Sequence, residues 1–263
     1  MGRAMKEEGH QAGGGAIPRA GNLIHDDLTD RLAEGGAPVA LCWTPARPVV
    51  VLGRSNDAAR EVDLEQARAE GVPIVRRKGG GGAVVLDLGT LCVTAAWPRP
   101  APFAPLAAFR AIGDAILEAL ATLGIERLVI RGTGDLALDG RKLAGASLAC
   151  GRGGLLYQMS LLVDPDFSRI ARLLRHPSRE PDYRRGREHG VFLTSLGREG
   201  FAIDPRALGE ALAGACRTIR FGHMRPPSLP PPVERGEEEN HPSRGDGFLP
   251  SPLDGEGPGV GLP

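Results

Sequence analysis

Three cations and four glycines follow one another at residues 76–83, in the order Arg76, Arg77, Lys78, four glycines and Ala83. Glycine allows positive φ and a close approach of the backbone to a ligand, and successive N–H groups can form an anion-binding concavity. Arginine adds paired hydrogen bonds to a carboxylate or phosphate. The alternative is a solvated basic turn, but the run lies between two apolar, strand-like segments. The sequence favours an anion-binding loop, which matches neither the P-loop nor the GxGxxG pattern.

A second segment that could do chemistry contains Asp135 and Lys142. These residues flank Asp139-Gly140, a strong signal for a two-residue hairpin turn, which would bring the ends of the two strands together. Small residues at 144–146 would let the lysine reach into a cleft. The alternative is an exposed hairpin lysine, and taken alone the segment favours that interpretation.

Composition and charge argue against several classes of protein. The 32 basic and 32 acidic residues give a formal net charge of zero, which argues against bulk nucleic acid or an anionic membrane as the main partner. No stretch approaches the ~18 apolar residues of a membrane span, and the first residues lack the apolar core of a secretory signal. The four scattered cysteines show no metal or disulfide spacing, so we expect a cytoplasmic protein.

Hydrophobic periodicity predicts the helices and strands that must position these residues. Helices are expected at 20–34, 61–71, 104–123, 166–174 and 205–219. Strands are expected at 40–43, 48–53, 72–77, 127–132, 134–150 (a hairpin) and 154–164, with a further hairpin or two edge strands at 83–97. This order predicts an α+β fold, in which a mixed or antiparallel sheet carries flanking helices.

The composition also predicts where the folded part begins and ends. Residues 1–17 are Gly-rich and charged, and are expected to form a flexible arm. Residues 225–263 hold ten of the 23 prolines and almost no apolar pattern, so we expect a disordered tail. One domain is therefore expected over residues 18–224.

Taken together and in order, these motifs resemble those of the lipoate–protein ligase A family, within the biotin/lipoate protein ligase group. The resemblance rests on VVVLGRSND, RRKGGGGAVVLDLG, GDLALDGRKLAGAS and REHGVFLTSL, and spans nearly all of residues 18–200. It implies a biotin/lipoate ligase catalytic fold, related to class II aminoacyl-tRNA synthetases. It also implies transfer of a lipoyl or octanoyl group, through an acyl-adenylate made from ATP, to a lysine of a lipoyl domain or glycine-cleavage H protein. Family members are often monomers.

The resemblance assigns roles to particular residues. Lys142 would be catalytic, offsetting the charge that develops on the acyl-adenylate oxygens. Asp135 would act on Mg²⁺ or the nucleotide. An apolar slot for the acyl chain would include Val84, Leu86 and the strand around Leu143. The implied acyl-adenylate-binding residues are Arg76, Arg77, Gly79, Gly80, Gly81, Gly82, Ala83, Asp135, Gly145 and Ala146.

The chain also departs from the family's usual pattern. Gly79 replaces a serine, Leu86 a histidine, and Gly134 an asparagine. The family's His-Gly pair on the next strand corresponds to Gln158-Met159. His189, in a segment that resembles one near the family's active site, is kept as a weaker candidate.

Two other functions remain open from the sequence. An octanoyltransferase would need a nucleophilic cysteine near the acyl site, but residues 123–141 and 155–215 hold none, and Cys150 is better explained as a core residue. A non-catalytic binder of lipoate or a lipoyl domain would explain the departures, although it would not require the retained cations, glycines and aspartate together. The Arg-rich segment 175–190 also carries acidic residues, which favours a solvated loop over a nucleic-acid site.

Overall fold

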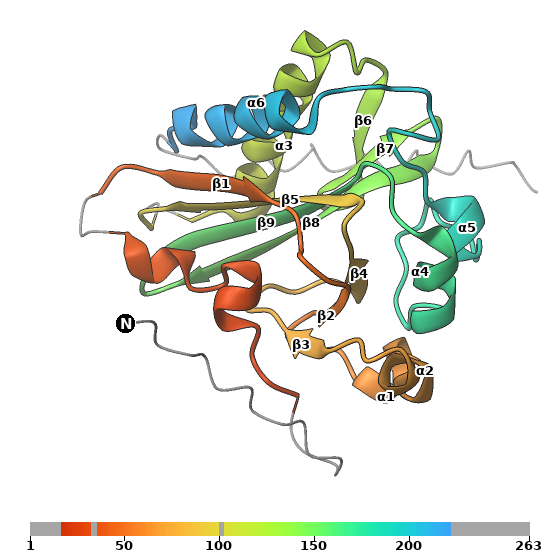
Figure 1. Cartoon of the computed structure of the whole chain (residues 1–263). Coiled ribbons are helices and arrows are strands. Elements are labelled where there is room, and N and C mark those ends of the chain that lie inside the picture. The colour runs from red at the N-terminus through yellow and green to blue at the C-terminus, as the bar shows by residue number, and fades with distance from the viewer. Residues whose placement is uncertain (1–16, 33–35, 100–102, 222–263) are drawn as a thin grey trace, which may run out of the picture. The chain divides into compact units, whose positions relative to one another are not determined.

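The computed structural model describes residues 17–32, 36–99 and 103–221 (Figure 1). All but one residue of the predicted N-terminal arm, and all of the predicted tail at 225–263, lie outside the described residues. Among the described residues, no helix is both long and apolar enough to cross a membrane.

A six-stranded antiparallel sheet carries most of the fold, with strand order β1-β5-β9-β8-β7-β6. The strands are β1 (Val39–Trp43), β5 (Thr90–Trp97), β6 (Leu128–Arg131), β7 (Asp135–Leu138), β8 (Arg141–Gly151) and β9 (Gly154–Leu162). The hairpin between β7 and β8 forms where the sequence predicts it, with φ of 47° at Asp139 and 75° at Gly140. Such positive φ values are those of the favoured two-residue hairpin turn.

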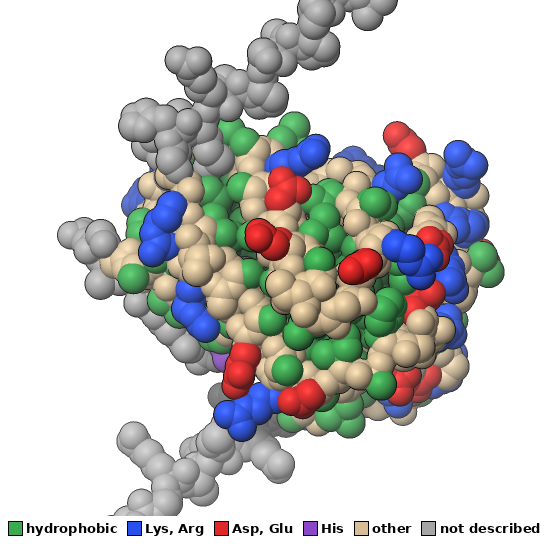
Figure 2. Space-filling view, turned by 90° about the horizontal axis from the view of Figure 1, so that it is seen from above, with side chains coloured by type: hydrophobic (Ala, Val, Ile, Leu, Met, Phe, Trp, Pro, Cys, Tyr) green, Lys and Arg blue, Asp and Glu red, His purple; other side chains and the backbone are tan. Residues whose placement is uncertain are grey.

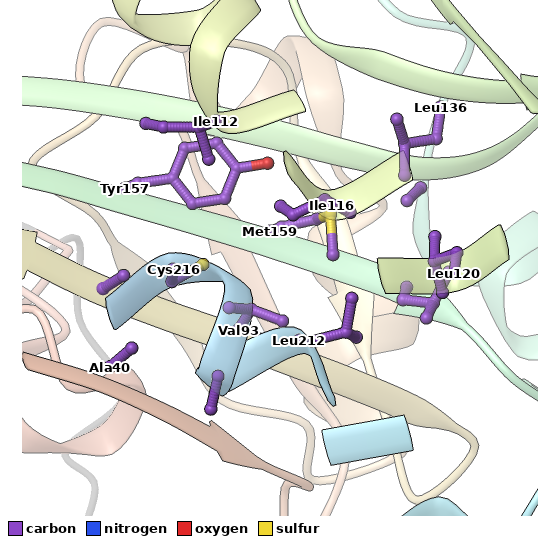
Figure 3. Packing of buried hydrophobic residues seen from close by; sticks show 14 of the residues in the cluster. Ala40, Val93, Ile112, Ile116, Leu120, Leu136, Tyr157, Met159, Leu212 and Cys216 are labelled. Carbon is purple, nitrogen blue, oxygen red and sulfur yellow. The ribbon is translucent and has the colours of Figure 1, made fainter. Parts of the chain in front are cut away.

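Two helices cover one face of this sheet, α3 (Pro105–Thr122) and α6 (Pro205–Thr218). Helical spacing puts Ile112 and Ile116 of α3 on one side, where they meet Tyr157 and Met159 of β9 (Figure 3). Proline at the first turn begins both helices, and Gly124, at φ 79°, follows the end of α3. Because this face is filled by the main core, a ligand site must lie on the other face of the sheet.

A second, three-stranded sheet has the order β3-β2-β4 and is formed by β2 (Val49–Leu52), β3 (Ile74–Arg76) and β4 (Val84–Leu86). Strand β2 pairs parallel to β3 and antiparallel to β4. Its side chains alternate, so that Val50 belongs to one apolar cluster with Ile170 and Val51 to another with Cys92 of the large sheet. The short helices α1 (Ala58–Glu61), α2 (Leu64–Ala69) and α4 (Phe167–Leu173) each begin at an aspartate whose side chain accepts backbone N–H groups.

The structure confirms the predicted α+β class and corrects two elements. The helix expected over 20–34 is instead two 3-10 helices, η1 (Gly21–Ile24) and η2 (Leu28–Arg31), separated by His25 at φ 53°. The segment 83–97 is not a hairpin, because β4 and β5 belong to different sheets. Nor is β5 an edge strand, since it lies between β1 and β9 and is buried throughout.

Candidate active site

A cavity of about 330 Å³ lies between the two sheets. The small sheet contributes Val51, Val84 and Leu86 to its wall, and the facing strands of the large sheet contribute small and polar side chains. The small and polar residues from the large sheet include Cys92, Thr94, Gly145, Ser147, Gln158 and Ser160, and the same sheet also contributes Trp43, Val93 and Met159 to the lining. The cavity therefore has an apolar wall on the small sheet and a wall with several polar groups on the large sheet, a combination that suits a ligand with an apolar chain and a polar head.

Strand register explains the polar wall. Thr94, Gln158 and Ser147 are cross-strand neighbours on β5, β9 and β8. Because side chains alternate along a strand, these polar positions face away from the core between the sheet and its helices. The Gln158 amide donates to the carbonyl of Ile24 at 2.9 Å, while its buried side-chain oxygen has no hydrogen-bond partner among the described residues. That oxygen is available to a donor group on a ligand.

Lys142 and Asp135 form an ion pair at the edge of this cavity. The distance from Lys142 Nζ to Asp135 Oδ1 is 2.8 Å, and both side chains are largely buried. A β-bulge positions the lysine, because Leu136 pairs with Ala144 while the next residue on β7 pairs with Lys142, which leaves Leu143 as the extra residue. The bulge shifts the alternation, so that Lys142 and Gly145 share the cavity side although they are three positions apart, a spacing that places side chains on opposite faces of a regular strand.

The second oxygen of Asp135 is held by Tyr183, whose hydroxyl donates to Oδ2 at 2.9 Å. The tyrosine ring lies 5.1 Å from the ring of Phe192, which fixes its direction. Burial and the neighbouring Asp135 carboxylate raise the pKa of Tyr183, so the hydroxyl keeps its proton and remains a donor. The carboxylate is thus held from both sides.

The Arg-rich segment around Tyr183 is tied to the strands that carry the ion pair. Arg187 Nη2 donates to the carbonyl of Gly140 in the hairpin turn at 2.9 Å, and the N–H of Thr194 donates to the carbonyl of Lys142 at 2.9 Å. Arg184 is buried, with its guanidinium 4.9 Å from the centre of the Phe192 ring. The segment is therefore only partly the solvated loop that the sequence favours.

Arg77 holds the glycine loop from beneath. Its guanidinium donates to the carbonyl of Gly80 at 2.6 Å and to that of Gly82 at 2.9 Å. Burial lowers the pKa of Arg77 to about 10, which leaves the side chain charged at neutral pH, and the nearby Asp26 carboxylate opposes the shift. The guanidinium thus organises the loop, a different arrangement from the direct ligand contact that the resemblance suggests.

Arg77 engages carbonyl groups of the glycine loop, whereas the backbone N–H groups of the loop stay available. The N–H groups of Gly80, Gly81 and Gly82 donate to no other atom of the described chain. Gly81 has a φ of 93°, a conformation that glycine adopts without strain. Successive free N–H groups beside a lysine form an anion-binding arrangement of the kind that the sequence predicts.

Gly79 is packed directly against β8. A Cβ at this position would stand 2.7 Å from Ser147 Oγ and 2.9 Å from Ser147 Cβ. The serine that the family's pattern has in the loop is thus replaced by a glycine whose space the Ser147 side chain occupies. A hydroxyl is still present beside the loop, but it comes from the sheet.

The predicted site residues are brought together only in part. Of these residues, the cavity is lined by Arg77, Gly81, Gly82, Ala83, Asp135, Lys142, Gly145 and Ala146. The Ala146 side chain packs against the main core, as does Leu143, which is fully buried. Gly79 is buried behind the loop and Gly80 is exposed, while Arg76 turns away from the cavity, toward the carbonyls of Gly53, Arg54 and Asn56. Val84 and Leu86 line the cavity as the resemblance implies.

The residues present do not fit a resident magnesium ion at Asp135. Its two oxygens are engaged by Lys142 and Tyr183, and the described residues contain no group of three or more acidic, histidine or cysteine side chains that could hold a metal. Magnesium prefers several oxygen ligands, so a single, doubly engaged carboxylate is a poor site. No role for a protein-bound metal follows from this geometry.

Two cysteines bear on the possibility of a thioester intermediate. Cys92 lines the cavity, but burial raises the pKa of its thiol, which disfavours the nucleophilic thiolate. Cys150 lines a separate hollow. His189 is buried and lies outside the lining of the cavity.

Several residues of the site were not singled out from the sequence. Polar residues alternate with apolar ones along β9 and β8, and this pattern could have pointed to Ser160 and Ser147, while Gln158 was identified only as the counterpart of a histidine in the family's pattern. For Tyr183 no local signal exists, because its partner lies 48 residues away.

Comparison with known proteins shows which protein family this chain matches. The model of the lipoyl protein ligase A/B catalytic domain matches residues 23–215. A protein of Aeropyrum pernix named "Putative lipoate-protein ligase A" is 38% identical over 160 residues, or 61% of this chain and 59% of the relative. A lipoate–protein ligase of Streptococcus pyogenes is 32% identical over 133 residues, or 51% and 38% of the two chains. The chain thus spans less than two thirds of either relative.

Solved structures share the fold. A lipoate-protein ligase A bound with ATP superposes with a TM-score of 0.63 at 22% identity, over 73% of this chain and 77% of that one. A ligase from Thermoplasma acidophilum, described with its E2 lipoyl domain, gives 0.62 at 21% identity, over 76% and 78%. At this identity the likeness establishes the fold, which confirms the predicted ligase-type architecture.

Proposed function

Because this chain belongs to the lipoyl protein ligase A/B family, we propose that it attaches a lipoyl or octanoyl group to a lysine of a carrier domain at the expense of ATP. The observation that carries the proposal is the Lys142–Asp135 ion pair at a cavity that is also lined by Gly81 and Gly82, whose N–H groups donate to no other atom of the described chain. A cation and free backbone donors around one cavity suit a reaction in which negative charge develops on phosphate and carbonyl oxygens.

In the first step, a carboxylate oxygen of the acid bonds to the α-phosphorus of ATP, and the bond between the α- and β-phosphates breaks to release pyrophosphate. The apolar wall at Val51, Val84 and Leu86 would hold the acyl chain. The Lys142 ammonium would stabilise the added charge on the α-phosphate oxygens. Magnesium enters this proposal only as part of the MgATP substrate, because Asp135 offers it no free oxygen.

In the second step, the neutral amine of the carrier lysine bonds to the acyl carbon. The bond from that carbon to the AMP oxygen then breaks, AMP leaves, and the amine loses a proton. Negative charge develops on the acyl oxygen during the attack, and the glycine-loop N–H groups and Lys142 are the donors available to stabilise it.

The relatives support these substrates. One similar structure is described as bound with ATP, another with lipoic acid, and a third with an E2 lipoyl domain as part of its lipoylation system. We therefore propose a lipoyl domain or glycine-cleavage H protein as the acceptor and a monomer as the working form. Ligase chemistry is favoured over thioester chemistry because the cavity's cysteine, Cys92, has a raised pKa.

The experiment that tests the proposal is a single-turnover assay of acyl-AMP formation from octanoate or lipoate and ATP labelled at the α-phosphate. We expect one labelled acyl-AMP per active protein molecule, with pyrophosphate released in equal amount. A non-catalytic binder would give no acyl-AMP even with protein in excess over ATP.

A further inference from the structure

Basic residues gather around a second hollow, of about 460 Å³, which shares Arg77 with the cavity. It lies between η2, the end of β3, the loop after β2 and the turn between β8 and β9. Its basic residues are Arg19, Arg54, Arg76, Arg77, Lys78 and Arg152, against a single acidic residue in the lining, Asp30. We call this surface the basic hollow. Since the whole chain has no formal net charge, the excess is local.

The Asp26 carboxylate, which is not in the lining, offsets part of the charge of Lys78, Arg77 and Arg19, but charge remains at the other cations. Lys78 Nζ lies 3.8 Å from Asp30, a long and exposed ion pair. Arg76 donates to backbone carbonyls, which carry no full charge. Arg54 and Arg152 are exposed, and neither side chain makes a hydrogen bond or ion pair to any residue in the described part of the chain. An excess of exposed, unpaired cations in a hollow attracts an acidic partner.

The place of the hollow indicates what that partner is. Arg77 lines both the hollow and the cavity, so the two adjoin at this residue, directly before the glycine loop. A stable protein interface covers about 800 Å² per partner, which is roughly 28 Å across. A folded acceptor that presents its lysine to the cavity beside this loop would therefore also cover the basic hollow.

We propose that the basic hollow is the docking surface for the acceptor domain, and that it receives acidic side chains that flank the acceptor's lysine. The inference rests on the proposed function, because it takes the acceptor to be a protein. Charge complementarity of this kind acts chiefly on the rate of encounter and on the choice of partner. The phosphates of the nucleotide or pyrophosphate are the competing occupants.

The test uses the full chain with Arg54→Glu, Arg152→Glu and the double substitution. The control is Arg206→Glu on α6, which is also highly exposed, with 85% of its side chain accessible. Arg206 lies in the first turn of α6 and pairs with Glu210 at 3.0 Å, and the view from above shows charges of both signs interspersed over the molecule (Figure 2). Each protein is assayed for acyl-AMP formation without acceptor, for acyl transfer to hydroxylamine, and for acyl transfer to a purified E2 lipoyl domain at several salt concentrations. Hydroxylamine is a small nucleophile that needs no docking surface.

We expect the double substitution to lower kcat/KM for the lipoyl domain about tenfold, to flatten its decrease with salt, and to leave the other two assays unchanged. The control should behave as the unsubstituted protein in all three. Equal losses with hydroxylamine and the lipoyl domain, or a raised KM for ATP, would assign the hollow to phosphate and overturn the docking proposal. So would a double variant that modifies the lipoyl domain at the control rate. If the unsubstituted protein forms neither acyl-AMP nor hydroxamate, the proposed function itself has failed, and the docking proposal with it.

Discussion

Lys142 Nζ and Asp135 Oδ1 are 2.8 Å apart because a β-bulge on β8 turns the lysine to the side of the sheet that faces the cavity. Without the extra residue, strand alternation would place Lys142 and Gly145 on opposite sides. The ion pair therefore depends on the β-bulge in β8. Gly145 on the same strand has no side chain and leaves room for the lysine.

Replacing Lys142 with alanine should strongly slow acyl-AMP formation and leave the fold intact. The side chain faces a cavity, so its loss leaves no gap in the core, while the charge that stabilises the phosphate oxygens disappears. We expect a loss of about 10²–10³-fold in the single-turnover rate, a typical effect of removing one such stabilising group. Thermal unfolding should show an unchanged cooperative transition. Retained turnover in a folded variant would refute the assignment of Lys142.

Replacing Gly145 with alanine should inactivate the protein without touching a charged group. The new Cβ would stand 2.8 Å from both Cε and Nζ of Lys142 and would force the lysine away from Asp135. We expect at least about a tenfold loss of acyl-AMP formation. Gly151→Ala on the same strand is the matched control, because no atom lies within 4 Å of its added methyl group. Similar rates for the two variants would show that the lysine's position does not matter.

Replacing Tyr183 with phenylalanine should slow the first step and spare substrate binding. The variant keeps the ring contact with Phe192 but loses the 2.9 Å hydrogen bond to Asp135 Oδ2. We expect kcat for acyl-AMP formation to fall about fivefold to tenfold, consistent with a loss of about 1 kcal/mol in orienting the ion pair, while KM for ATP stays unchanged. A change in KM alone, with kcat retained, would contradict a positioning role.

His189 should make stability dependent on pH below neutrality. Burial lowers its pKa to about 4, with Arg184 and His176 adding to the shift. An unfolded chain, in which histidine has its ordinary pKa of about 6.5, takes up a proton that the folded chain refuses, so stability is lost as the pH falls from about 6.5 toward 4. Each pH unit in this window removes about 1.4 kcal/mol. The free energy of unfolding is measured with urea at pH 7.5 and at pH 5.5. Between these two pH values it should fall less in His189→Gln than in the unsubstituted protein, and equal decreases would exclude His189 as the cause.

The sequence predicted well what local signals determine. The helix expected at 104–123 is α3 at Pro105–Thr122, and the Asp139-Gly140 turn joins β7 to β8. Helical spacing and turn chemistry act within a few residues, so a single sequence carries them. The ordered motifs likewise brought the glycine loop and Lys142 into one prediction.

What the sequence could not determine depends on partners far along the chain. Alternation identifies 90–97 as a strand, but it does not say that β5 pairs with β1 and β9 and not with β4. The contacts of Arg77 could not be determined from the sequence either, because an arginine beside glycines can bind a ligand or the loop's own carbonyl groups. In the structure its guanidinium donates to the carbonyls of Gly80 and Gly82, and the residue also lines the cavity. The bulge at Leu143 leaves no mark in the sequence.

The central claim is tested most directly by the intact mass of a purified lipoyl domain, incubated with this protein and octanoate, with and without MgATP. We predict a mass increase of one octanoyl group, dependent on ATP and absent when the acceptor lysine is replaced. A mass increase only from an octanoyl-acyl carrier protein thioester, without ATP, would contradict the ligase proposal and would favour a transferase with a nucleophilic cysteine. No increase from either donor would contradict any acyl-transfer function.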